Sequence, residues 1–143
     1  MCPEHWSLLP HYHYVDRITG RYDGYYDTNL GRGCTGPCTL AITEAQTWSH
    51  KWGASIGFSK DPVSATVGYD VTYSSTQTFS YSFPVNAGET KVVIQRDWYH
   101  VTNMEVRTDW LYCTSVNCSV VSQEFGTAWA GQWFQRIFRA ERV

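Results

Sequence analysis

Histidines are the residues of this sequence best suited to chemistry, and two of the five stand close together. His11-Tyr12-His13 places two imidazoles on one face of an extended segment, because alternate side chains of a strand point the same way. With His5 or Asp16, the two rings can complete a metal site. The alternative is an aromatic-rich surface segment whose histidines are satisfied by neighbouring groups. We favour this alternative, so the sequence predicts no metal and no cofactor.

Carboxylates gather in two further places. Asp23, Asp27 and Asn29 lie near glycines and can supply oxygen ligands to calcium, but their spacing matches no EF-hand loop. Glu105 and Asp109 share one face of an expected strand, although no partner for acid–base catalysis is evident beside them. These spacings therefore predict neither a calcium site nor a catalytic pair.

Other chemistry is also poorly supported. Nucleophilic catalysis lacks a Gly-x-Ser-x-Gly elbow, and His50 and His100 stand alone in expected strands. Aromatic side chains can stack on sugar rings, but they more often fill a β core. The tryptophans that can form such a platform are Trp98, Trp110, Trp129 and Trp133. The sequence thus predicts a protein that is not an enzyme, with a small hydrolase or metal enzyme as the third hypothesis for its function.

The cysteines point to an oxidising environment. Cys34-Thr-Gly-Pro-Cys38 and Cys113-Thr-Ser-Val-Asn-Cys118 each close a short loop, and two local disulfides leave Cys2 over. Other pairings that involve Cys2, and a zinc site that joins the two pairs, stay open. Disulfides favour a secreted, extracellular protein.

The beginning of the sequence and its charge narrow the function classes. Residues 1–15 lack the apolar run of a signal peptide, so we interpret Met1 as an added start on a mature chain. The 11 basic and 13 acidic residues give a net charge of −2, without the basic stripe that nucleic-acid binding requires. The basic cluster Arg136, Arg139 and Arg142 is better suited to solubilising the C-terminus than to binding an anion. No run approaches the ~20 apolar residues of a membrane helix.

The elements that position these residues read as strands. A length of 143 residues with 43% hydrophobic and 16% aromatic residues suits one folded domain. Residues 39–60 suggest two strands, 90–112 suggest another, and 127–143 fit a strand better than a helix. Residues 1–33 are expected to be an irregular, aromatic-rich segment that packs on the domain, as a strand or two, or acts as an arm. We therefore predict an all-β, antiparallel β-sandwich.

The most regular pattern runs from residue 63 to residue 83. Its odd positions are apolar or aromatic except Ser75 and Gln77, and its even positions are all polar or glycine. This alternation predicts one unusually long strand, bent near the two polar exceptions. Three hypotheses explain such a strand: a membrane-barrel strand, an edge that binds another chain by strand addition, and an ordinary sandwich strand with a hydroxyl-rich outer face.

The Ser/Thr-rich stretch between Thr47 and Gly88, with its Val63-Ser-Ala-Thr-Val-Gly-Tyr-Asp-Val-Thr run, resembles small secreted β proteins of actinomycetes. The resemblance covers roughly residues 33–100. Some of these proteins are the linking subunit of Streptomyces umbrella toxin particles, where they join a lectin subunit to a ring-forming stalk subunit. The resemblance implies a non-enzymatic adaptor of an exported antibacterial complex, with lectin-like and repeat-containing partners. The same stretch also resembles the long strands of aerolysin-type pore formers.

Our first hypothesis is therefore a secreted interaction module, and the alternative is a pore-forming or membrane-acting toxin. We expect partner contacts on the aromatic N-terminal segment and on the edge of the long strand. The expected partner-binding residues are Trp6, His11, Tyr12, His13, Tyr14, Tyr25 and Tyr26.

Overall fold

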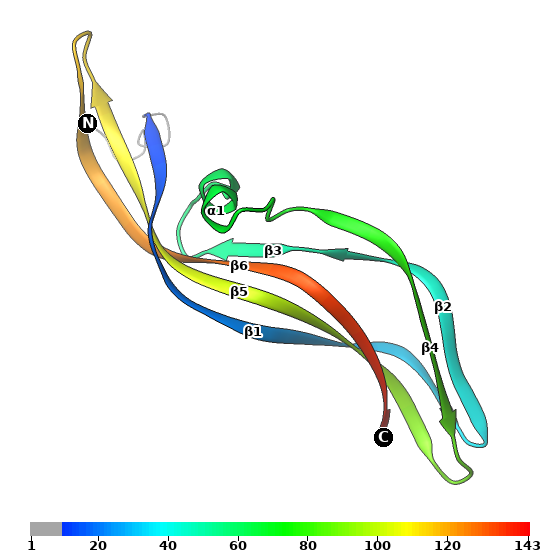
Figure 1. Ribbon diagram of the computed structural model, residues 1–143. Coiled ribbons are helices and arrows are strands. Elements are labelled where there is room, and N and C mark those ends of the chain that lie inside the picture. Colours follow the sequence, from blue (N-terminus) through cyan, green and yellow to red (C-terminus); the bar gives the residue numbers. More distant parts are fainter. Residues whose placement is uncertain (1–9) are drawn as a thin grey trace. The chain divides into compact units, whose positions relative to one another are not determined.

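The computed structural model describes residues 10–143, and these form long strands and one helix (Figure 1). The elements in chain order are β1 (His11–Thr35), β2 (Cys38–Ser49), β3 (Lys51–Ala54), α1 (Lys60–Val67), β4 (Ser74–Val85), β5 (Thr90–Cys113) and β6 (Cys118–Arg142). The strands make a four-stranded sheet in the order β1-β5-β6-β3 and a two-stranded sheet of β2 and β4. The prediction of an all-β, antiparallel, sandwich-like fold is confirmed.

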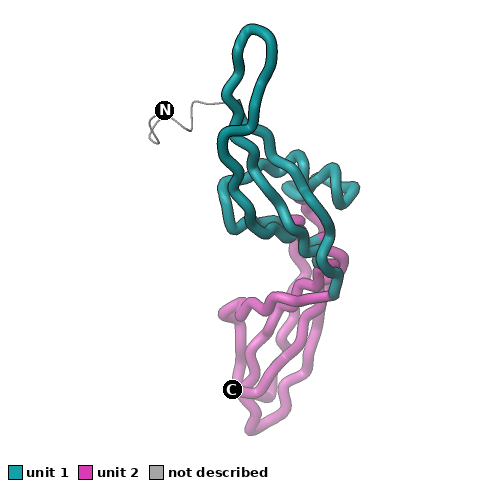
Figure 2. Tube along the Cα trace, turned by 90° about the vertical axis from the view of Figure 1, so that its left-hand side faces the viewer, with its two compact units in different colours: residues 1–22, 51–72, 101–131 teal, residues 23–50, 73–100, 132–143 magenta. Residues whose placement is uncertain are grey.

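The described residues divide into two compact units (Figure 2). Unit 1 holds residues 10–22, 51–72 and 101–131, and unit 2 holds residues 23–50, 73–100 and 132–143. Strands β1, β5 and β6 each contribute one part to unit 1 and another to unit 2. Each unit has a hydrophobic core of its own.

The core of unit 1 joins the helix to the sheet. Its fully buried members come from α1, the turn after it, β5 and β6: Val63, Val71, Met104, Val106, Ala128 and Ala130. The short strand β3 pairs with β6, and Gly53 lies opposite Trp129. A Cβ at Gly53 would lie 2.8 Å from the indole nitrogen of Trp129. Only glycine therefore leaves room for the Trp129 ring to pack against the backbone of β3.

The core of unit 2 lies between the two sheets. Strands β2 and β4 pair from Cys38 opposite Val85 to Ser49 opposite Ser74. From β4, the ring of Tyr81 stacks on Phe138 of β6 at 4.5 Å between centroids. Since the even-numbered side chains of β4 are exposed and the odd-numbered ones mostly face inward, the predicted alternation is correct over residues 74–83.

The prediction of one long strand over residues 63–83 is wrong in its first part. Residues 60–67 form helix α1, and the strand begins only at Ser74. Ser59 caps the helix, because its Oγ accepts a hydrogen bond from the backbone N–H of Asp61. At the other end, Gly68 has φ 85° and donates its N–H to the carbonyl oxygen of Ser64.

The alternating pattern misled here because it contains a helical spacing as well. Val63 and Val67 are separated by four residues, so they share one helix face and both pack in the core of unit 1. Ala65, between them, is exposed. Local capping by Ser59 and Gly68 thus selects the helix, whereas the apolar periodicity alone fits either structure.

The long strands lie elsewhere in the chain. β1 and β6 have 25 residues each and β5 has 24. The prediction that the N-terminal segment is irregular is therefore wrong for residues 11–33, which belong to strand β1. The prediction of a C-terminal strand is confirmed. The sequence pattern did not predict β1, because its glycines have low strand propensity. Pairing with β5 stabilises the extended conformation there. No helix within residues 10–143 has the length and apolar character needed to cross a membrane.

Candidate partner-binding surface

Strand β1 lies at an edge of the four-stranded sheet. Within the described residues, its hydrogen-bonded neighbour in the sheet is β5, and no strand lies on its other side. An edge strand presents backbone N–H and C=O groups that another chain can pair with. A partner that adds a strand there gains main-chain hydrogen bonds and side-chain contacts together.

Tyrosines are the large hydrophobic side chains that β1 exposes. Five of them have exposed fractions between 41% and 61%: Tyr12, Tyr14, Tyr22, Tyr25 and Tyr26. Tyrosine suits a binding surface because its ring supplies apolar area and its hydroxyl supplies a hydrogen bond. Four of the five were predicted as partner contacts. Tyr22 was missed, because no strand register was assigned to residues 1–33 that would have shown which of their tyrosines are exposed.

The two predicted histidines are held by unit 1. Nδ1 of His13 lies 2.8 Å from Oγ1 of Thr108, and its ring packs against Phe58 at 4.9 Å between centroids. The ring of His11 lies over Trp110 at 4.4 Å. Burial, and then the charge of His11, lower the pKa of His13 below its ordinary value. These rings therefore fix the start of β1 against β5.

Metal binding gains no support from this geometry. Within residues 10–143, no three His, Cys, Asp or Glu side chains are grouped as metal ligands. His5, like Trp6 and Cys2, lies outside the described residues. Asp27, expected as a calcium ligand in the alternative interpretation, instead accepts hydrogen bonds of 2.8 and 3.0 Å from Arg96.

The exposed tyrosines are bordered by paired charges in each unit. In unit 1, the guanidinium of Arg107 lies 4.7 Å above the ring of Tyr14 and pairs with Asp16. In unit 2, the guanidinium of Arg96 lies 3.7 Å above the ring of Tyr25. The hydrogen bond from Arg96 lowers the pKa of Asp27, so this carboxylate stays charged to a lower pH than an ordinary aspartate.

The carboxylates considered for catalysis are committed to ion pairs. Glu105 accepts two hydrogen bonds of 2.9 Å from Arg17, and this lowers its pKa. Asp109 is buried and accepts from Arg107 and from Gln123. A hollow of about 300 Å³ in unit 1 is lined by Asp16, Glu105, Val106, Phe125, Gly126 and Thr127. Since each carboxylate has a cationic partner, this hollow presents no unpaired acid or base.

The tryptophans considered for sugar binding are divided between the units. Trp110 and Trp129 belong to unit 1, and Trp98 and Trp133 belong to unit 2. Trp133 stacks on Trp48 with a centroid distance of 4.3 Å and an interplanar angle of 12°. Ring faces used for such packing are less available to a sugar.

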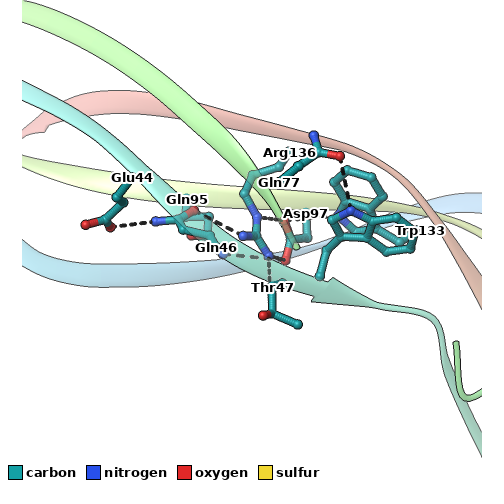
Figure 3. Close-up of polar contacts among 9 residues, drawn as sticks. Glu44, Gln46, Thr47, Gln77, Gln95, Asp97, Trp133 and Arg136 are labelled. Atoms are coloured by element: carbon teal, nitrogen blue, oxygen red, sulfur yellow. Dashed lines mark hydrogen bonds and ion pairs between the residues drawn. The ribbon is translucent and has the colours of Figure 1, made fainter. Parts of the chain in front are cut away.

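A buried polar network holds the two sheets of unit 2 together (Figure 3). Arg136 of β6 forms an ion pair with Asp97 of β5, with Nε and Oδ1 2.6 Å apart. Its Nη1 reaches across to Oε1 of Gln46 on β2 at 3.1 Å, and Nη2 donates to the carbonyl oxygen of Thr47. Burial, followed by the charge of Asp97, raises the pKa of the nearby Tyr99 to about 12. The sequence predicted that Arg136 solubilises the C-terminus, but in the structure its side chain is buried in unit 2.

The disulfides lie where the sequence placed them. Cys34 and Cys38 join the end of β1 to the start of β2 in unit 2. Cys113 and Cys118 close the turn between β5 and β6 in unit 1.

No family model matches the chain, and neither the curated proteins nor the solved structures contain a significant match.

Proposed function

We propose that this protein is a secreted, non-enzymatic interaction module that binds a partner protein along the exposed edge of β1. The observation that carries the proposal is the edge strand itself, which combines an unpaired edge in the described sheet with five exposed tyrosines. Strand addition uses such an edge, and tyrosine anchors add affinity to it.

The setting of this module is part of the proposal. Two disulfides fit an extracellular protein. Roughly residues 33–100 resemble small secreted actinomycete proteins, which supports the role of an adaptor subunit in an exported antibacterial complex. Its partners would then be a lectin-like subunit and a repeat-containing subunit.

The test is a quantitative pull-down of the tagged protein from the culture fluid of its native host, read by mass spectrometry. We expect a stoichiometric partner with the wild-type chain and at least a tenfold loss with Tyr22→Lys. Phe125→Lys is the matched control, since Phe125 is an exposed aromatic residue on β6, outside both β1 and residues 63–83. Melting temperatures verify that all variants fold.

Two results would contradict the proposal. One is a partnerless monomer in the culture fluid, and the other is equal partner capture by the wild-type chain and Tyr22→Lys. Release of dye from liposomes by the wild-type chain, together with SDS-resistant oligomers, would favour the membrane-acting toxin instead.

A further inference from the structure

The turn between β5 and β6 is a part of the chain without charge. From Trp110 to Gln123 the sequence has no Asp, Glu, Lys or Arg, although charged residues make up 17% of the whole chain. Charged residues return at both ends of this segment, with Asp109 on β5 and Glu124 on β6. We call residues 110–123 the hairpin tip.

The hairpin tip exposes apolar side chains. Val116, at the turn, is 87% exposed, and Tyr112, Val120 and Val121 are exposed as well. Figure 2 shows this hairpin extending beyond the other described segments of unit 1. Among the described residues of that unit, none extends past the tip on this side, so the turn can meet a flat surface.

The polar backbone of the tip is largely satisfied within the turn. The N–H of Thr114 donates to the carbonyl oxygen of Asn117 at 2.7 Å. The N–H groups of Val116 and Asn117 both approach Oγ1 of Thr114 at 3.3 Å. The Cys113–Cys118 disulfide closes the same turn. Because these donors have partners inside the turn, transferring it out of water leaves fewer of them unsatisfied.

We propose that the hairpin tip inserts into the headgroup region of a lipid bilayer. An uncharged tip fits this environment because charged side chains are costly there, and the exposed aromatic ring of Tyr112 at its base suits the interface. A protein partner is disfavoured by composition, since Val, Ser and Thr, which dominate the turn, are under-represented among binding hot spots. Ser115, Asn117 and Ser119 limit the insertion to the interface.

This inference is independent of the proposed function, because the exposed turn of the tip around Val116 is not part of the tyrosine-bearing edge of β1. Lipid binding by the tip would bring the module and its β1 partner to a membrane without requiring a pore. The two ideas can therefore fail separately.

The experiment is co-sedimentation of the full chain with phosphatidylcholine vesicles, repeated at low and high salt. We expect binding that salt does not change, because no charge on the tip takes part. Val116→Asp should weaken the vesicle affinity about tenfold, since it places a charge in the interface. Val143→Asp is the matched control, because Val143 is 84% exposed but is the C-terminal residue and lies outside the hairpin tip.

Several results would overturn the inference. These are no binding at millimolar lipid, equal binding by the wild-type chain and Val116→Asp, and binding that high salt abolishes. Loss of a protein partner with Val116→Asp, combined with no vesicle binding by the wild-type chain, would assign the tip to a protein contact. Val116 is almost fully exposed, so its substitution should leave the melting temperature unchanged, and Val116→Lys provides a second charged variant.

Discussion

The buried ion pair between Arg136 and Asp97 allows a direct test of how unit 2 is held together. Their side chains are 5% and 12% exposed, and two hydrogen bonds of 2.6 and 3.0 Å join them. Replacing Arg136 by Met keeps an unbranched apolar chain of similar length. This substitution leaves the carboxylate of Asp97 buried without its cationic partner. It also leaves Oε1 of Gln46 without the hydrogen bond that Arg136 donates.

Breaking one side of a buried pair costs about 3–5 kcal/mol, because an uncompensated charge stays in a region of low polarity. This is a large part of the ~5–15 kcal/mol by which a domain is typically stable. For a chain of this size, the melting temperature should fall by roughly 10 °C. We expect this result for Arg136→Met and a similar one for Asp97→Leu.

The double variant separates the ion pair from ordinary packing. With Arg136→Met and Asp97→Leu together, neither charge remains, so the loss of stability should be smaller than the sum of the single losses by about 2 kcal/mol. Some loss remains, because the indole N–H of Trp133 also donates to Asp97, at 3.3 Å.

The assay is urea unfolding, followed by tryptophan fluorescence and by circular dichroism, with coincident transitions as the condition for extracting free energies. The matched control is Arg17→Met in unit 1, whose ion pair with Glu105 has side chains 68% and 45% exposed. We expect no resolvable change there. Single losses below about 1 kcal/mol in unit 2, or additive effects in the double variant, would refute the reasoning.

Two further predictions concern unit 1. Gly68→Ala should destabilise the protein by about 1 kcal/mol, because φ 85° is costly for any residue with a Cβ. A Cβ at Gly57 would meet no other atom, so Gly57→Ala should have little effect in the same melting experiment. Because the pKa of His13 is lowered in the folded state, the unfolded chain takes up the proton first as the pH falls below about 6.5. The free energy of unfolding should therefore fall from pH 7.5 to pH 5.5, and His13→Gln should make this fall smaller; equal slopes for the two proteins would contradict the assignment.

Pattern reading succeeded where a segment has its own strong periodicity. Over residues 74–83 the alternation of apolar and polar side chains largely matches the inward and outward faces of β4. β5 was also expected from its alternation. Both cysteine pairs followed from their short spacing, because a loop of this length brings two thiols together without help from distant residues.

Pattern reading failed where a local signal competed with it or where the signal was weak. Helix α1 shares its apolar spacing with a strand, and its caps at Ser59 and Gly68 decided the outcome. The glycines between residues 20 and 33 suggested irregular chain, yet this stretch belongs to β1, because β5 pairs with it. The candidate surface on β1 was predicted as a group of aromatic residues but not as the edge of a sheet.

The sequence by itself determined the fold class and the aromatic character of the N-terminal segment, since these depend on composition and periodicity. It favoured two local disulfides from the short cysteine spacing, and the structure decided between these and the other pairings. Only the tertiary structure decided that Arg136 belongs to a buried network, that His13 is fixed by Thr108, and that β1 is an edge strand. Each of these depends on residues far apart in the chain, which folding brings together and which no local pattern encodes.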